Sequence, residues 1–455
     1  MYYNTCMSKI KSPGVAGIFY PAGAGELNKY IDHFKYNSKN YYEYKTRAVI
    51  VPHAGINYSG QLAYNGLKLL NPNLQTLFIF APAHHVPFQN LCIASYSEWE
   101  TPFGNIKVNQ RINKELNDRF YIGCYNEAFE DEHSIEIQLP FIKSIFEDVS
   151  IVPVLVGKSD TNAILKLIKH YWDDKNIGFV ISSDLSHFLK DKDAQKLDLL
   201  TAEMVEKGDI TQFNYKQACG SFGICALTEF ASEQKFSLIR NGLMNSSATT
   251  GDTSRVVGYG SWFLYEGSTN EFLKKYYSGK ILRICREVIL GELNRTNYGN
   301  LTHLHLPPVF EERIASFVTL EKDNQLRGCI GSILAHRTLK EDLIANAKAA
   351  AFRDPRFSPL ERSEFENLSI AVSLLSQPES ISFASEKDLL EQIEPFKDGL
   401  IIKDDVYQAV YLPSVWEQLP DKKDFLSSLK VKAGLSADYF SNTFEAFKFN
   451  SEYIK

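Results

Sequence analysis

The stretch Ile177-Gly-Phe-Val-Ile-Ser-Ser-Asp-Leu-Ser-His187 decides the fold of the first half of the chain. It opens with five apolar residues, of which Ile177, Val180 and Ile181 are β-branched. Small and polar residues follow. A short apolar run that gives way to such residues is typical of a buried β-strand followed by a loop. Three more stretches share this pattern: Arg47–Val51 before Pro52-His53-Ala54-Gly55, Thr76–Phe80 before Ala81-Pro82-Ala83-His84-His85, and Ser150–Val156 before Gly157.

Helix-period segments lie around these strands, most clearly at 135–146, 162–172 and 193–207. Strand–helix alternation with continuously apolar strands predicts a mostly parallel sheet that helices cover on both faces. The run Val256–Tyr265 is expected to be the closing strand, and the polar stretch Glu266–Asn270 a linker. The first half is therefore predicted to be an α/β domain.

The pattern changes after the linker to that of a smaller α+β domain. We expect one helix over 271–290 and another that begins at Thr338. Strands are predicted at 313–320, 326–331, 369–375 and 399–403. No internal repeat is visible.

Composition excludes several classes of protein. The 455 residues are 44% hydrophobic and 23% charged, as in soluble globular chains of two or three domains. The formal charge of −6 argues against a nucleic-acid binder. No apolar run approaches the roughly 20 residues of a membrane helix, and the N-terminus lacks the pattern of a signal peptide. Seven cysteines without a C-x-x-C motif argue against a disulfide framework, so we expect a cytoplasmic protein.

Histidines and an aspartate follow the predicted strands directly: His53, His84, Asp184 and His187. Carboxyl ends of parallel strands form the ligand-binding edge of an α/β sheet. Imidazoles bind first-row transition metals, and Cys219 is a candidate for a third, anionic ligand.

Each of these residues also has a purely structural interpretation. One histidine at a strand end is more often solvated than ligating, and a single cysteine is more often a small buried hydrophobe. Asp184 and His187 would share a face on a helical turn, where they could support the ligands and move a proton, but Asp184 could equally be a helix N-cap. His85 ranks below His84, because adjacent residues on an extended segment point in opposite directions.

Six segments in the first 266 residues resemble the Memo family in order and spacing. They are Val15–Pro21, Val51–Gly55, Pro82–Pro87, Asp131–Glu136, Pro153–Gly157 and Ser182–His187. The resemblance covers about residues 12–266. It implies the LigB-like fold of class III extradiol dioxygenases, whose iron is held by two histidines and a glutamate that Memo proteins replace by cysteine.

The resemblance also implies roles for particular residues of this chain. The metal ligands would be His53, His84 and Cys219. His187 would stand where the dioxygenases have a general base, Asp184 would flank it, and His133 would line the same pocket. With a thiolate ligand, iron(II) and copper rank ahead of zinc. Cys225 competes with Cys219 but lies in an apolar pattern typical of a core.

The second part of the chain, about residues 272–455, resembles the AMMECR domain. The resemblance rests on Leu326–Gly331, Ala350–Phe357, Lys397–Leu400 and Tyr411–Trp416. In prokaryotes both families occur with a radical SAM enzyme, in the AmmeMemoRadiSam system, so the resemblance implies such a partner.

A possible second site lies in the AMMECR-like part. Arg327, Arg353 and Arg356 could bind an anion, and Cys329 beside them could be a reactive thiol. The alternative is that Cys329 is buried in a strand while the arginines pair with Asp354 and nearby glutamates.

Two functional hypotheses follow. The first is a metal-dependent oxidoreductase, related to the extradiol dioxygenases, that acts on a small substrate. The second is a non-catalytic module that binds metal or peptide, or that delivers metal to the partner. His187 separates them, because only an enzyme needs an acid–base group beside its ligands.

Overall fold

The computed structural model describes residues 10–38, 41–159, 161–296 and 301–455. It contains two compact units. The first comprises the residues up to Ser268 together with Pro307–Val309, and the second comprises Thr269–Leu306 and Phe310–Lys455. Helix α10 (Thr269–Leu293) begins inside the stretch expected to be a linker, because its polar residues suit the first turn of a helix as well as a loop.

The first unit is built on an 11-stranded sheet. Its centre runs in the order β7 (Ser150–Val156), β3 (Thr76–Pro82), β8 (Ile177–Ser182), β2 (Ala48–Val51), and all three of these pairings are parallel. Antiparallel strands β11 (Val256–Tyr265) and β10 (Ser237–Asn245) complete one side. The predicted α/β class with a mostly parallel sheet is confirmed.

Shorter strands complete the other side of this sheet and its ends. They are β1 (Ile10–Lys11), β4 (Leu91–Ile93), β5 (Glu98–Trp99), β6 (Ile106–Val108) and β9 (His187–Leu189). The antiparallel pairs β5–β6, β4–β7 and β9–β11 lie among them. Sequence patterns predicted none of these five, because two or three residues are too few to display a period.

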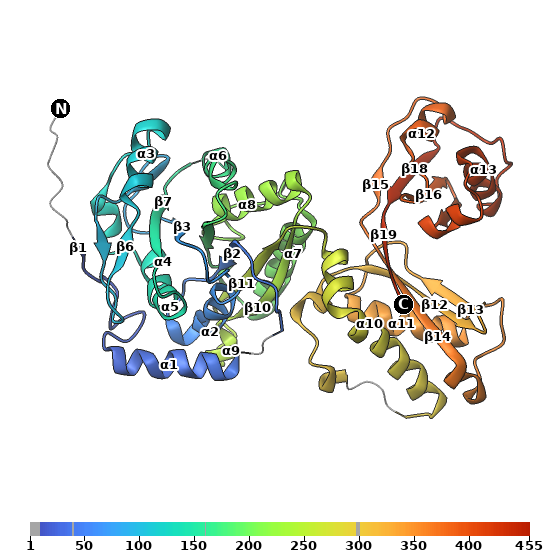
Figure 1. Cartoon of the computed structure of the whole chain (residues 1–455), viewed down its shortest axis with the longest axis horizontal. Helices are drawn as coiled ribbons and strands as arrows, with labels where there is room; N and C mark the ends of the chain where they lie inside the picture. Colours follow the sequence, from blue (N-terminus) through green and yellow to red (C-terminus); the bar gives the residue numbers. More distant parts are fainter. Residues whose placement is uncertain (1–9, 39–40, 160, 297–300) are drawn as a thin grey trace. The chain divides into compact units, whose positions relative to one another are not determined.

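Helices cover both faces of the sheet (Figure 1). One face carries α1 (Ala24–Asn37), α2 (Ile56–Leu67) and α5 (Gln138–Ile145), whose aromatic rings pack together around Phe34 and Phe141. The other carries α3 (Gln110–Phe120), α6 (Thr161–Tyr171), α7 (Asp191–Lys207) and α8 (Ser221–Gln234), which share one large core with alternate residues of the strands. Every residue of β2 is buried, because both faces of the strand are covered.

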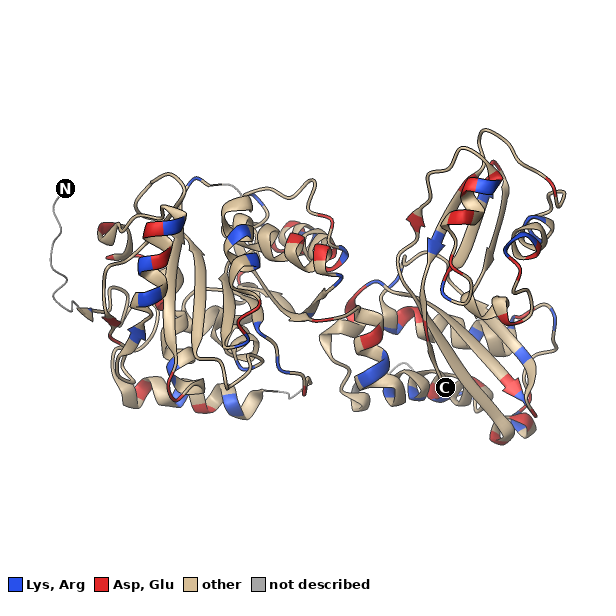
Figure 2. Cartoon of the chain, turned by 45° about the horizontal axis from the view of Figure 1, so that its top comes forward, with Lys and Arg blue, Asp and Glu red and all other residues tan. Residues whose placement is uncertain are grey.

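Charged side chains gather on the helices and loops, whereas the central strands carry almost none (Figure 2). This distribution is expected of a sheet that is buried on both faces.

The short helices α4 (His133–Glu136) and α9 (Ser247–Thr250) and the 3-10 turn η1 (Asn126–Phe129) complete the unit. No helix in the described part of the chain is long and apolar enough to cross a bilayer.

The second unit holds two antiparallel sheets. The first has the order β13 (Gln325–Gly331), β12 (Ala315–Lys322), β14 (Leu368–Leu375), β19 (Ser451–Ile454), with α10 and α11 (Leu339–Phe352) packed on it. Thr338 caps α11 in a capping box with Glu341. The second sheet has the order β15 (Glu379–Ser380), β18 (Glu445–Phe449), β16 (Gly399–Asp404), β17 (Tyr407–Tyr411). This is the predicted smaller α+β part.

The remaining elements are short, apart from α13, and all lie in the second unit except η3, whose first two residues belong to the first. They are η2 (Leu301–Leu304), η3 (Pro308–Glu311), η4 (Arg362–Asn367), α12 (Glu386–Gln392), η5 (Pro413–Glu417) and α13 (Lys422–Lys432). Around the second sheet, α12, η5 and α13 enclose a separate core centred on Trp416, whose indole stacks on Phe425 and donates to the Asp398 carbonyl.

Candidate metal centre

Three histidines meet at the carboxyl edge of the central sheet. His53 follows β2, His84 follows β3, and His133 opens α4. Their ring centroids lie 4.6 to 5.4 Å apart, and one nitrogen of each ring lies within 4.8 Å of the others. The sheet order explains the meeting, because β2 and β3 both pair with β8 and therefore end at the same edge.

The His53 ring is fixed by a serine at the end of β8. Ser182 donates its one hydroxyl proton to the Ser134 carbonyl at 2.6 Å, so toward His53 Nδ1, at 3.1 Å, it must act as an acceptor. The proton of the neutral ring is therefore on Nδ1, and Nε2 keeps a free lone pair. Burial, reinforced by His84 and His133, lowers the pKa of His53 well below its ordinary value, so the ring is neutral.

The His84 ring is fixed by Glu132, a residue that sequence reasoning did not single out. One carboxylate oxygen accepts the backbone N–H of His84 at 2.6 Å, and the other accepts Nδ1 at 2.9 Å. Burial alone would raise the pKa of Glu132, but the bonds from His84 outweigh it and lower the pKa to about 2. The ionised carboxylate thus accepts a hydrogen bond from Nδ1–H, which leaves the lone pair of His84 Nε2 to a metal.

His133 is held differently from the other two. Its ring stacks on Phe19 at 4.5 Å, and burial lowers its pKa to about 4. Its buried Nδ1 makes no hydrogen bond within the described structure and stands 3.4 Å from a Glu132 oxygen. A cation bound among the three rings could supply the partner that this buried nitrogen lacks.

Cys219 lies against His53, just before α8. Its Sγ is 3.3 Å from His53 Nε2 and 3.6 Å from the Asp184 carbonyl. Burial, followed by the nearby Asp184 carboxylate, raises the pKa of the thiol to about 12. A metal would therefore have to displace the proton of this thiol. Cys225, the competing cysteine, is buried within α8.

Asp184 connects the two ligand segments. Its carboxylate accepts the backbone N–H of His53 at 2.8 Å and that of Ala54, while its carbonyl accepts the Cys219 N–H at 3.3 Å. Burial raises its pKa to about 7 against these hydrogen bonds. The carboxyl group thus contacts backbone of the ligand loop.

His187 lies at the start of strand β9, so Asp184 and His187 do not share a helical turn, which corrects the expectation of one. The backbone forms a β-bridge with β11 here instead. His187 Nδ1 donates to the Leu185 carbonyl at 2.8 Å, which leaves Nε2 as an acceptor. Burial lowers the pKa of His187, and His84 lies near enough to add to the effect.

The arginines of the second unit are mostly engaged in ion pairs. Arg327 binds Glu364 through two nitrogens, and Arg356 binds Asp354 at 2.7 Å. Half-buried Cys329 receives a contact from Thr319 at 3.3 Å and offers its carbonyl to Arg356 at 3.1 Å.

Arg353 ends α11 with an exposed side chain that takes part in neither pair. The structure therefore groups Cys329 with Arg356 but neutralises the arginines beside it. The anion-binding role of this group stays a prediction.

Two family models match the chain: "Memo-like protein" over residues 11–263 and "AMMECR1" over residues 282–454. A MEMO1 family protein of Thermoplasma volcanium is 32% identical over 272 residues, which cover 55% of this chain and 97% of the relative. A protein of Methanosarcina mazei is 40% identical over 177 residues, covering 39% of this chain and 88% of its own.

Among solved structures, the chain is similar to an uncharacterized protein from Pyrococcus horikoshii. The match has 32% identity and a TM-score of 0.36, and it covers 38% of this chain and 88% of the other.

Proposed function

The chain belongs to the Memo-like protein family and continues into an AMMECR1 domain, and from this premise we propose that its first unit is a metal-dependent oxidoreductase acting on a small substrate. The observation that carries the proposal is the fixed tautomer of two imidazoles. Ser182 and Glu132 occupy Nδ1 of His53 and His84, so both rings hold Nε2 ready for a cation.

The proposed metal ligands are His53, His84 and Cys219. A ring nitrogen of His133 lies next to the two histidine ligands. We propose iron(II) or copper ahead of zinc, because zinc lacks the redox chemistry of an oxidoreductase, whereas imidazole and thiolate ligands suit all three metals. A bound ion of this kind would supply one-electron redox chemistry and open coordination positions for a substrate.

His187 is proposed as the proton acceptor of the site. Its Nδ1–H is fixed by the Leu185 carbonyl, so Nε2 carries the lone pair, and its lowered pKa keeps the ring neutral at pH 7. Asp184 is proposed as a positioning residue, because its carboxyl group binds the backbone at His53 rather than another reactive side chain.

A second candidate function is a non-catalytic module that binds metal or peptide, or that delivers metal to a partner. The side chain of His84 favours it, since it is 28% exposed, and a ligand open to solvent permits exchange. In this alternative His187 has no role in activity.

The metal content of the purified protein shows whether the first unit binds a metal. Anaerobically purified protein should contain near-stoichiometric iron or copper by mass spectrometry, and the His53→Ala variant should lose it. Cobalt substitution identifies the third ligand: Cys219→Ser should abolish the thiolate-to-cobalt charge-transfer absorption, and His133→Asn should keep it. If no preparation contains metal, even after reconstitution, the metalloenzyme proposal is wrong. The proposal of a peptide-binding module would then remain.

Oxygen consumption then separates the enzyme from the module. A His187→Gln variant with full metal content and lost activity supports catalysis, whereas unchanged function supports the second candidate.

We further propose a radical SAM protein as the partner, in the cytoplasm. None of the six cysteines in the described ranges forms a disulfide, which is consistent with that compartment. Co-purification from the native host tests the partner.

A further inference from the structure

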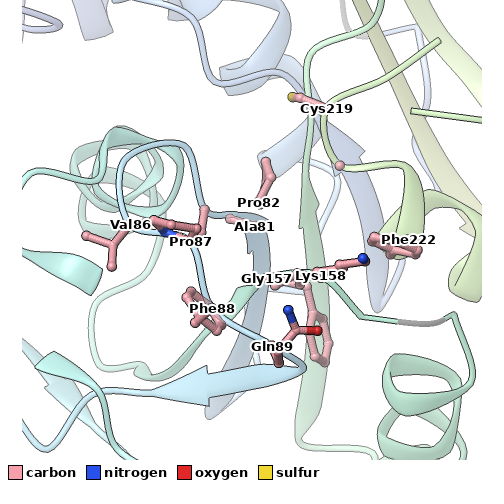
Figure 3. A pocket seen from close by; sticks show the side chains of 15 residues that line it. Ala81, Pro82, Val86, Pro87, Phe88, Gln89, Gly157, Lys158, Cys219 and Phe222 are labelled. Atoms are coloured by element: carbon pink, nitrogen blue, oxygen red, sulfur yellow. The ribbon is translucent and has the colours of Figure 1, made fainter. Parts of the chain in front are cut away.

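A cavity of about 530 Å³ opens beside the candidate metal centre. One of its wall residues is Cys219, whose sulfur lies 3.3 Å from His53 Nε2. Figure 3 shows Cys219 at one end of the lining, with Phe88 and Gln89 toward the other. The size is that of a site for a small molecule.

Most of the residues that line this cavity have apolar side chains. Aromatic rings come from Phe80, Phe88 and Phe222, and aliphatic surface comes from Val86 and Val156. The wall at Gly157 admits no side chain, because a Cβ there would lie 2.4 Å from the Phe88 carbonyl oxygen. Such a lining favours a ligand with a flat or extended hydrocarbon body.

Lys158 is the one charged residue among the 15 described residues that line the cavity, apart from the ionisable thiol of Cys219. Its backbone is fixed, since its N–H donates to Phe88 and its carbonyl accepts from Asn90, both at 2.9 Å. No hydrogen bond or ion pair within the described part of the chain engages its ammonium group, whose side chain lies with the other lining side chains in Figure 3. The cavity thus joins apolar side chains to one positive charge that no described residue pairs with.

We propose that this cavity is the substrate site and that it selects a small amphiphilic carboxylate. The apolar body contacts Phe88 and Phe222, the carboxylate pairs with Lys158, and another part of the molecule reaches Cys219. A carboxylate fits better than a phosphate, because one flexible ammonium balances one negative charge and the lining contains no arginine fork. This inference rests on the proposed function for its catalytic meaning, but the binding itself does not require a metal.

The probe is 4-phenylbutyrate, compared with the neutral 4-phenylbutyramide of the same shape. Calorimetry on the full-length, chelator-treated protein at low salt removes coordination of the carboxylate to a metal from the comparison. We expect the carboxylate to bind about 5-fold more tightly than the amide, since one solvent-accessible charge pair contributes up to ~1 kcal/mol.

Three variants locate the effect. Lys158→Met keeps the length of the side chain and should remove the preference for the carboxylate without changing the affinity of the amide. Lys158→Arg should retain the preference. Phe88→Ala should weaken both probes equally. The matched control is Lys196→Met, which removes an exposed lysine of α7 outside the cavity.

Equal affinity of the two probes for the native protein, or an unchanged preference in Lys158→Met, would overturn the inference. So would absence of carboxylate binding at millimolar concentration. Metal content of the same proteins is measured separately, on samples taken before the chelator treatment. If carboxylate binding depends on Lys158 but the protein contains no metal, the carboxylate site is supported and the metalloenzyme proposal fails. If the protein contains metal but binding does not depend on Lys158, the metalloenzyme proposal stands and the carboxylate site fails.

Discussion

The carboxylate of Glu132 holds His84 at two points, accepting its backbone N–H at 2.6 Å and its Nδ1 at 2.9 Å. The side chain of Glu132 is 1% exposed, and it also accepts the Ser134 N–H at 3.0 Å. One buried carboxylate therefore sets the rotation, the tautomer and the loop position of a proposed ligand.

Glu132→Gln should weaken metal binding about 10- to 100-fold, the range found for residues that orient metal-bound histidines. The amide has one acceptor where the carboxylate has two, so one of the two bonds to His84 is lost. Competition titration with a chromogenic chelator measures the affinity. Glu127→Gln, an exposed glutamate upstream in η1, is the control and should bind metal as the native protein does. Native affinity in both variants would contradict the orienting role.

Gly220→Ala should disturb Cys219 through the backbone. A Cβ at this position would lie 2.7 Å from the Cβ of Ser183 and 2.9 Å from the Ser182 carbonyl oxygen, so the segment must shift. We expect a loss of stability of about 1–3 kcal/mol, as for other overpacked sites, and weaker metal binding. Urea unfolding and the same chelator titration test both.

The matched control for that variant is Gly25→Ala in α1, where an added Cβ meets nothing within 4 Å. Its stability should stay equal or rise slightly, because alanine is the better helix former. A Gly220→Ala protein as stable and as competent for metal as this control would refute the packing argument.

Asp198 makes stability depend on pH. It is 2% exposed, accepts the Ser186 N–H at 3.0 Å, and burial raises its pKa to about 6. The folded state therefore holds this proton more tightly than the unfolded state, whose pKa is about 3.9, so stability falls as pH rises from about 4 to 6. Full ionisation should remove about 2–3 kcal/mol.

Asp198→Asn removes that dependence, because the amide does not ionise. Urea unfolding at pH 4 and pH 7 should show the variant gaining about 2 kcal/mol on the native protein between the two values. Asp193→Asn, an exposed position on the same helix, serves as the control. A difference between variant and native protein that stays constant with pH would contradict the prediction.

Glu206→Gln should be the most destabilising of these substitutions. Glu206 binds Arg240 through two bonds of 2.7 and 2.8 Å and accepts the Trp262 indole N–H at 3.0 Å, with both charged side chains at most 7% exposed. Neutralising the acid leaves the arginine buried without its counter-charge, which removes about 3–5 kcal/mol.

The control breaks a surface pair instead. Lys169 and Glu233 are about 40% exposed, so Glu233→Gln should change stability by less than about 1 kcal/mol. Thermal unfolding of the two variants side by side measures the contrast. Equal shifts in melting temperature would show that burial does not decide the value of the Glu206 pair.

The central strands and the polar segments after them were predictable, because strands buried on both faces read as continuous apolar runs that stop at the loops. The bonds that orient the rings were not. Glu132 stands in the acidic run Glu130-Asp131-Glu132, where nothing in the sequence separates it from its exposed neighbours. Its role arises only when β3 brings His84 against α4. Ser182 was likewise one small residue among several at the end of β8.

The partners that form the site are far apart along the chain: His53 and Cys219 have a sequence separation of 166. Contacts of such high sequence separation form late, since a long loop must close before they stabilise anything. A nascent chain leaving the ribosome carries the His53 and His84 segments first and cannot complete the pocket until β8 has inserted between them and the Cys219 segment has been synthesised. Metal acquisition is therefore expected to follow translation of the whole first unit, as a step of maturation rather than a nucleus for folding.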